Sequence, residues 1–148
     1  MKKRSFPTPL GEMCLTEENG CITEFLWGGG GADETPLLLE AQRQVTEYFA
    51  GTRKAFELPL APNGTPFQKS VWQALCDIPY GETRSYGEIA KAVGNGKASR
   101  AVGMANHRNP IPVIIPCHRV IGADGTLTGY GGGLERKTLL LKLEASKK

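Results

Sequence analysis

The chain is short and mildly basic. It has 148 residues, of which 40% are hydrophobic and 22% are charged, and its net charge is +3, which fits one or two small globular domains. No apolar run approaches the roughly 20 residues that span a membrane, and Phe6-Pro7-Thr8-Pro9 follows the basic start in place of an apolar signal core. We therefore expect a cytoplasmic protein without a membrane partner.

Residues 1–62 predict a small α/β domain. Two apolar stretches, at 13–15 and 21–27, flank the turn-forming Glu18-Asn19-Gly20, and this pattern favours a β-hairpin. Apolar residues then recur at helical spacing from Pro36 to Ala50. A sheet supported by one helix is therefore expected.

The boundary between the two predicted domains coincides with a change in charge. After a predicted strand at 56–60, Ala61-Pro62-Asn63-Gly64 interrupts the chain. Residues 1–62 hold six Lys/Arg and nine Asp/Glu, a net charge of −3, whereas residues 63–148 hold twelve and six, a net charge of +6. This indicates a polyanion-binding domain on a supporting domain, although a chance split over short segments gives the same pattern.

Three helices are predicted at the start of the second domain. Thr65 caps the first, with Pro66 at its first position and Gln68 completing a capping box. A second capping box, Ser85-Tyr86-Gly87-Glu88, begins a short helix, and residues 97–106 form a third. Two short helices joined by a glycine-containing turn are typical of a helix-turn-helix.

The third helix has a predicted inner and outer face. Arg100 points outward when the small apolar residues face inward. The predicted inner residues are Ala98, Ala101, Val102 and Ala105.

The rest of the chain predicts strand, turn, strand and a last helix. Asn109-Pro110-Ile111-Pro112 cannot continue the third helix, and Val113-Ile114-Ile115 reads as a short buried strand. A turn follows at 122–125, and a helix over about 134–144 is expected to bury Leu140, Leu141 and Leu143. A helix-turn-helix followed by strand, turn and strand resembles a winged helix.

Cys117 is the candidate nucleophile. A cysteine reacts as its thiolate, and the nearby groups that could favour the anion are His118 and Arg119. Neighbours on a regular strand face opposite ways, but Pro116 disrupts the strand and favours a turn that allows contact, directly or through water. From the residues alone, a buried small hydrophobe is the alternative reading.

The other cysteines bear on metal and redox chemistry. Without a secretory context, we expect all four cysteines to be free thiols. His107 and His118 are the only histidines, and no Cys-x-x-Cys pair exists, so zinc-ligand spacing is absent near Cys117. Cys14 and Cys21 are interpreted as buried thiols.

The run Pro116-Cys117-His118-Arg119-Val120 resembles the active-site signature of the O6-alkylguanine-DNA alkyltransferases, also called methylated-DNA–protein-cysteine methyltransferases. Three further segments resemble that family, in the same order and spacing: Ser85 to Ala90, Ala98 to Gly103 and Asn109 to Ile115. The close resemblance covers residues 65–144.

The resemblance implies a role for each catalytic residue. Cys117 would attack the alkyl carbon on guanine O6, and His118, through a water, would pass the thiol proton toward Glu144. Tyr86 would assist departure of the guanine anion, and Asn109 would brace the turn before the active-site segment. Without the family, Glu144 reads as a solvated carboxylate at a helix end, and Tyr86 as a partly buried aromatic.

The resemblance also implies contacts with DNA. Arg100 would fill the space left by an extruded guanine, although an outward arginine can also contact only phosphate. Minor-groove binding with low sequence specificity is expected. The implied DNA contacts are Arg100, Ser99, Ala101, Gly103 and Arg119, with Ala105 also allowing close approach. The implied substrate pocket is Pro112, Val120, Tyr130 and Gly131.

The implied protein is an α+β monomer that works without cofactor or metal. A ribonuclease H-like domain at 1–62 would precede a winged-helix domain at 63–148. The protein would transfer an alkyl group from O6-alkylguanine, and possibly O4-alkylthymine, in double-stranded DNA to Cys117, once per molecule, and would associate with the nucleoid of a bacterial-type cell when bound. The alternatives are a non-catalytic protein that binds alkylated DNA, which Cys117 argues against, and a cysteine hydrolase, which leaves the helix-turn-helix unexplained.

Overall fold

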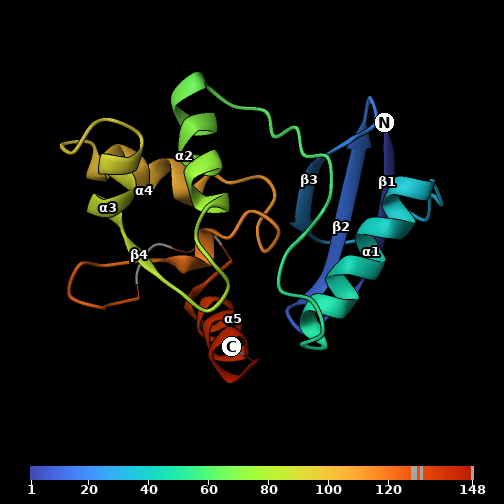
Figure 1. The fold of residues 1–148 in the computed structure, drawn as a ribbon. Coiled ribbons are helices and arrows are strands. Elements are labelled where there is room, and N and C mark those ends of the chain that lie inside the picture. Colours follow the sequence, from blue (N-terminus) through green and yellow to red (C-terminus); the bar gives the residue numbers. More distant parts are fainter. Residues whose placement is uncertain (128–129, 131, 148) are drawn as a thin grey trace. The chain divides into compact units, whose positions relative to one another are not determined.

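The computed structural model describes residues 1–127, 130 and 132–147. The chain folds as two compact units, Met1–Asn63 and Gly64–Lys148, and both mix helix and strand (Figure 1). Among the described residues, no helix has the length and apolar character to cross a membrane.

The first unit is built on a three-stranded antiparallel sheet in the order β1 (Lys2–Thr8), β2 (Gly11–Glu18) and β3 (Cys21–Trp27). The predicted hairpin is β2 with β3. It turns at Asn19 and Gly20, whose φ angles of 51° and 78° are those of the tight turns that suit twisted hairpins. The strand β1 has no counterpart in the sequence analysis.

Helix α1 (Pro36–Phe49) covers one face of this sheet (Figure 1). Thr35 caps it, and its side chain accepts a hydrogen bond from the Leu38 amide at 3.1 Å. The apolar faces of helix and sheet meet in a core. That core includes Phe6, Met13, Leu15, Ile22, Phe25, Leu38, Val45 and Tyr48.

Two predictions for the first unit are wrong. Residues 56–60 do not form a strand: only Leu60 bridges to Ile22, and Pro59 has no amide hydrogen to donate to a ladder. Cys14 and Cys21 are half-buried rather than buried. Cys14 lies between the buried Met13 and Leu15 on β2 and therefore faces the opposite side of the sheet, and Cys21 is the first residue of β3.

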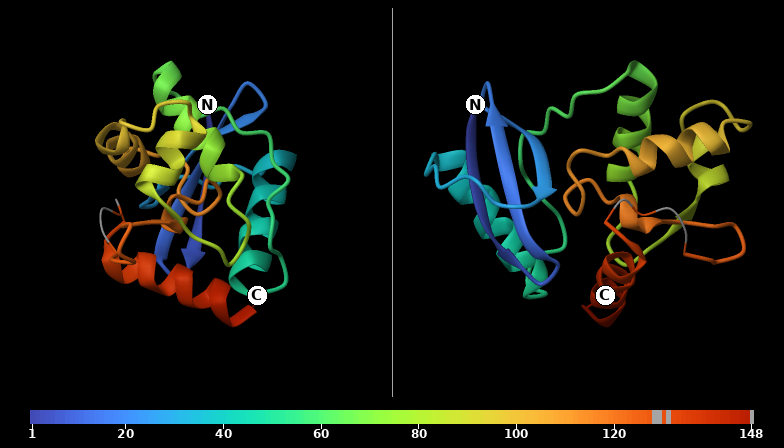
Figure 2. Two further views of the ribbon diagram at one scale, coloured as in Figure 1. Left: turned by 60° about the vertical axis from the view of Figure 1, so that its left-hand side comes forward. Right: turned by 180° about the vertical axis from the view of Figure 1, so that it is seen from behind.

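The second unit begins with three helices, α2 (Pro66–Cys76), α3 (Tyr86–Ala92) and α4 (Ser99–His107), which cluster together (Figure 2). Both predicted capping boxes are present, at Thr65 and at Ser85. The helices share a buried core of Val71, Trp72, Leu75, Ile89, Ala90 and Val102.

The inner face of α4 differs from the prediction at Ala101. Ala101 is exposed, and Val102, Ala105 and Asn106 are the buried residues of the helix. Ala105 and Asn106 follow Val102 by three and four residues, so these three side chains share one face of the helix.

The remaining elements hold the active-site segment between them. Cys117–Arg119 form a 3-10 turn, β5 (Val120–Ile121) follows it, and β5 pairs in parallel with β4 (Arg84–Ser85). The last helix, α5 (Leu134–Lys147), buries Lys137, Leu140 and Glu144.

One further prediction for this region is wrong. Leu141 and Leu143 are half-buried, not buried, since the inward stripe of α5 runs at spacings of three and four from Lys137. Of the predicted wing, the structure describes the short strand β5 and the turn after it, where the Gly122 amide donates to the Thr126 carbonyl at 2.8 Å. Residues 128 and 129, where the return strand would follow, lie outside the described residues.

Candidate active site

The segment before Cys117 is a tight buried turn rather than the predicted strand. Residues 111–116 are all buried, and Val113 has a φ of 73°, a left-handed conformation that is strained for a β-branched residue. Asn109 braces the turn at both ends: its Oδ1 accepts from the Ile111 amide and its Nδ2 donates to the Ile115 carbonyl, each at 2.9 Å. Asn109 therefore links the two ends of this turn, at the position for which the family resemblance implied a brace.

Cys117 is buried, with 3% of its surface exposed, at the start of the 3-10 turn. Burial raises the pKa of its thiol to about 11, while hydrogen bonds from Asn109 and Tyr130 and the charge of Lys137 act in the opposite direction. The resting group is therefore a thiol. The predicted activators, His118 and Arg119, both contact the carboxylate of Glu144.

His118 and Arg119 instead meet at Glu144, a carboxylate that is 1% exposed on α5. His118 Nε2 lies 2.7 Å from one oxygen of Glu144, and the Arg119 guanidinium donates to both oxygens at 2.8 and 2.9 Å. The Gly81 amide also donates to Glu144, at 3.2 Å. The solvated carboxylate that the sequence alone suggested is thus a buried acceptor.

This cluster sets the tautomer of His118. An ionised carboxylate can only accept, so Nε2 carries the hydrogen and Nδ1 is the acceptor. Burial lowers the pKa of His118, which favours the neutral ring. Nδ1 is buried and has no hydrogen-bond partner among the described residues.

Lys137 is a functional candidate that sequence reasoning missed. Its side chain has no exposed surface, and its Nζ donates to the Val120 carbonyl at 2.6 Å. Its sequence setting, Arg136-Lys137-Thr138, is that of an ordinary solvated helix face. The only signal is its position three residues before Leu140 on the buried stripe.

Asn106 was also missed. It is buried on α4, and its Nδ2 donates to the Cys117 carbonyl at 3.2 Å. The same carbonyl accepts the Val120 amide. A polar residue one helical turn after Val102 was the available signal, and its consequence is a direct tie between α4 and the nucleophile's backbone.

Tyr86 begins α3 directly after β4, so the parallel pairing of β4 with β5 draws it toward the segment that carries Cys117. It is half-buried. A β-carbon built on Gly103 of α4 would lie 3.8 Å from the Tyr86 ring, an ordinary contact distance. The packing of the unit therefore does not itself require glycine at 103.

The residues predicted to contact DNA separate into two groups. Arg100 and Ala101 are exposed on α4, Ser99 and Gly103 are half-buried there, and Ala105 is buried, which removes Ala105 from any outer surface. Arg119 is 7% exposed: it donates to Glu144 and to the Ile78 carbonyl at 2.7 Å. Its prediction as a DNA contact is wrong because a buried carboxylate engages its guanidinium.

Three of the predicted pocket residues are buried near Cys117. Pro112 and Val120 lie on either side of it in the chain, and Tyr130 is close enough that Cys117 contributes to raising the pKa of its phenol, after burial. The Val120 carbonyl already accepts from Lys137 but has a second lone pair. Gly131 lies outside the described residues.

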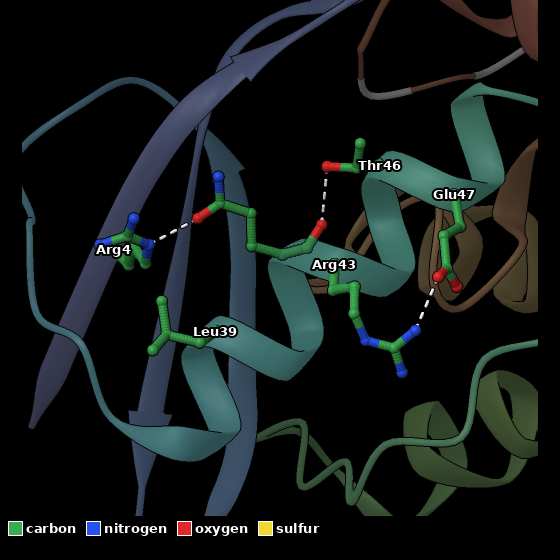
Figure 3. A pocket seen from close by; sticks show the side chains of 6 residues that line it. Arg4, Leu39, Arg43, Thr46 and Glu47 are labelled. Atoms are coloured by element: carbon green, nitrogen blue, oxygen red, sulfur yellow. Dashed lines mark hydrogen bonds and ion pairs between the residues drawn. The ribbon is translucent and has the colours of Figure 1, made fainter.

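The first unit has a hollow of about 340 Å³ between β1 and α1 (Figure 3). Its two arginines are engaged: Arg43 pairs with Glu47 at 2.6 Å, and Arg4 donates to Gln42. The Thr46 hydroxyl donates to the Gln42 carbonyl. The hollow carries no nucleophile or base comparable to Cys117 and His118, and no reaction is assigned to it.

Comparisons with known proteins bear on both units. A family model for the DNA-binding domain of 6-O-methylguanine DNA methyltransferase matches residues 66–146. A methylated-DNA–protein-cysteine methyltransferase of Methanosarcina acetivorans is 55% identical over 95% of this chain and 96% of its own, and the constitutive one of Bacillus subtilis is 54% identical over 93% and 91%. The solved structure of Mycobacterium tuberculosis OGT in complex with DNA aligns with a TM-score of 0.92 at 45% identity, covering 99% of this chain and 94% of that one.

Proposed function

The chain belongs to the O6-methylguanine DNA methyltransferase family, and from that membership we propose the part that each of its residues plays in the reaction. The protein repairs DNA by transferring an alkyl group directly from the damaged base to one of its own cysteines. We assign that cysteine as Cys117. The observation that carries the assignment is a buried thiol that follows the turn braced by Asn109 and directly precedes the His118–Glu144 pair.

The proposed step is an in-line displacement at the alkyl carbon. The Cys117 sulfur forms the new S–C bond as the C–O6 bond breaks, and guanine leaves as its anion, which takes up a proton that Tyr86 helps to deliver. The product is a thioether on Cys117 and an unmodified guanine. A thioether is stable in neutral water, so one molecule repairs one lesion.

The thiol proton must leave as sulfur attacks, because a pKa of about 11 leaves little thiolate at neutral pH. Forming the anion first would cost roughly 5 kcal/mol at pH 7. The proposed acceptor is His118 Nδ1, through one water, since Nε2 is committed to Glu144. Glu144 stabilises the imidazolium that forms, in the manner of a buried carboxylate behind a catalytic histidine.

The target atom lies inside a base stack, so the proposal includes extrusion of the nucleotide at a cost of a few kcal/mol. Arg100 is exposed on α4 and is assigned to the vacated space. Helix α4 is assigned to the minor groove, with low sequence specificity. A monomeric, cytoplasmic protein with a winged-helix second domain remains part of this proposal.

The test is repair of a duplex that carries one O6-methylguanine. We expect wild-type protein to convert the lesion to guanine with a yield equal to the number of protein molecules. Cys117→Ala should convert none and still bind the duplex, whereas Cys76→Ala, which removes an exposed cysteine, should repair normally. Repair by Cys117→Ala, or conversion of many lesions per molecule, would overturn the proposal.

A further inference from the structure

The second unit contains a buried cation that the reaction as described does not use. Lys137 lies on the first part of α5 with no exposed surface. Burying an ammonium costs several kcal/mol unless its surroundings compensate it, so lysine is among the rarest residues at such a position. A burial this costly suggests that the charge has a function, and Lys137 contacts the active-site segment at the Val120 carbonyl.

We propose that Lys137 is a positioning residue whose ammonium favours the developing Cys117 thiolate and fixes the turn that carries the nucleophile. The inference rests on the proposed function, because it deepens the role of the same site.

The geometry ties Lys137 to the backbone around Cys117. Its Nζ donates to the Val120 carbonyl at 2.6 Å, and the Val120 amide donates to the Cys117 carbonyl across the 3-10 turn. Two consecutive hydrogen bonds through Val120 therefore connect the ammonium to the backbone of the nucleophile. A cation in this place lowers the free energy of an anion formed on Cys117, because attraction between charges is strong in a buried, weakly polar site.

The other charged groups at the site are committed elsewhere. Arg119 donates to Glu144 and to a backbone carbonyl, and His118 shares the same carboxylate. Of the groups that favour the Cys117 anion, Asn109 and Tyr130 are neutral donors and Lys137 supplies positive charge. The interaction is mutual, because the charge of Cys117 in turn favours the ammonium form of Lys137.

A purely structural role makes a different prediction from an electrostatic one. Lys137→Gln removes the charge but keeps an N–H that can donate to the Val120 carbonyl, whereas Lys137→Met removes both. Lys142→Gln is the matched control, because Lys142 is exposed on the same helix. Comparing the three variants separates the effect of the Lys137 charge from the effect of its hydrogen bond and from the general effect of replacing a lysine on this helix.

The experiment measures, as a function of pH, transfer from a free O6-alkylguanine base and, separately, labelling of Cys117 by iodoacetamide, located by peptide mapping. An opposite charge at close range lowers a pKa by about 1–3 units. We therefore expect Lys137→Gln and Lys137→Met to move both pH profiles upward by about 1 unit or more and to slow the neutral-pH reactions about tenfold. Lys142→Gln should keep the wild-type profiles.

A Lys137→Gln protein that folds and keeps the wild-type pH profile would overturn the inference, since charge would then have no part. Should Lys137→Met fail to fold, Lys137→Gln alone decides between the two roles. Failure of the proposed function is a different result: wild-type protein would then transfer no alkyl group, while iodoacetamide would still report the ionisation of Cys117.

Discussion

At the scale of single residues, the site depends on one buried carboxylate with several donors. Glu144 accepts from His118, Arg119 and the Gly81 amide. It holds the imidazole in one tautomer and compensates a buried guanidinium at the same time. Cys117 itself is kept as a neutral thiol by burial, so its reactivity depends on how its neighbours take the proton and favour the anion.

The first prediction concerns that carboxylate. Glu144→Gln leaves the buried Arg119 charge without compensation, so we expect the free energy of unfolding to fall by about 3–5 kcal/mol, with slower alkyl transfer from any surviving folded protein. Glu82→Gln removes an exposed partner of Arg84 and should change the stability by about 1 kcal/mol or less. Urea unfolding at neutral pH measures both. Equal, small effects would contradict a structural role for the buried cluster.

Sequence reasoning reached these residues unevenly. The pairing of His118 with Glu144 was implied by the family resemblance, and spacing alone placed Glu144 in solvent. Arg119 was assigned to DNA because a basic residue in a basic half reads as a surface charge, and only the fold brings Glu144 to it. Lys137 was missed for the same reason, because tertiary packing decides whether a charged side chain is buried, and the neighbouring residues in the sequence do not predict it.

At the scale of elements, local chemistry predicted the helix starts and the hairpin. The capping boxes at Thr65 and Ser85 and the turn at Asn19 need only neighbouring residues. The short parallel pairing of β4 with β5 joins segments more than thirty residues apart, so no local sequence pattern predicts it. Residues 113–115 have the composition of a strand, but the Asn109 brace holds them in a turn.

The second prediction concerns the outer face of α4. Gly103→Ala meets no close contact within the unit, so helix propensity should raise the stability by about 0.5–1 kcal/mol. If the backbone of α4 approaches DNA closely, the added methyl should nonetheless slow duplex repair and leave reaction with a free base unchanged. Arg100→Ala should show the same split without the gain in stability. Undiminished duplex repair by Gly103→Ala would contradict close approach at this position.

At the scale of the whole molecule, charge and chemistry lie in the same unit. Residues 63–148 carry the net charge of +6 and also Cys117, His118 and Glu144, so the part suited to a polyanion is the part that reacts. The first unit is acidic and has its own helix-on-sheet core. The family match likewise covers the second unit, at residues 66–146.

The most direct measurement is the position of the transferred methyl group on the full chain. After reaction with a duplex that carries O6-methylguanine, peptide mass spectrometry should find one added CH2 mass on the peptide that contains Cys117, in step with guanine formed. Peptides with Cys14, Cys21 and Cys76 should stay unmodified. A methyl group on another residue, or repair with no mass gain on the Cys117 peptide, would contradict the account.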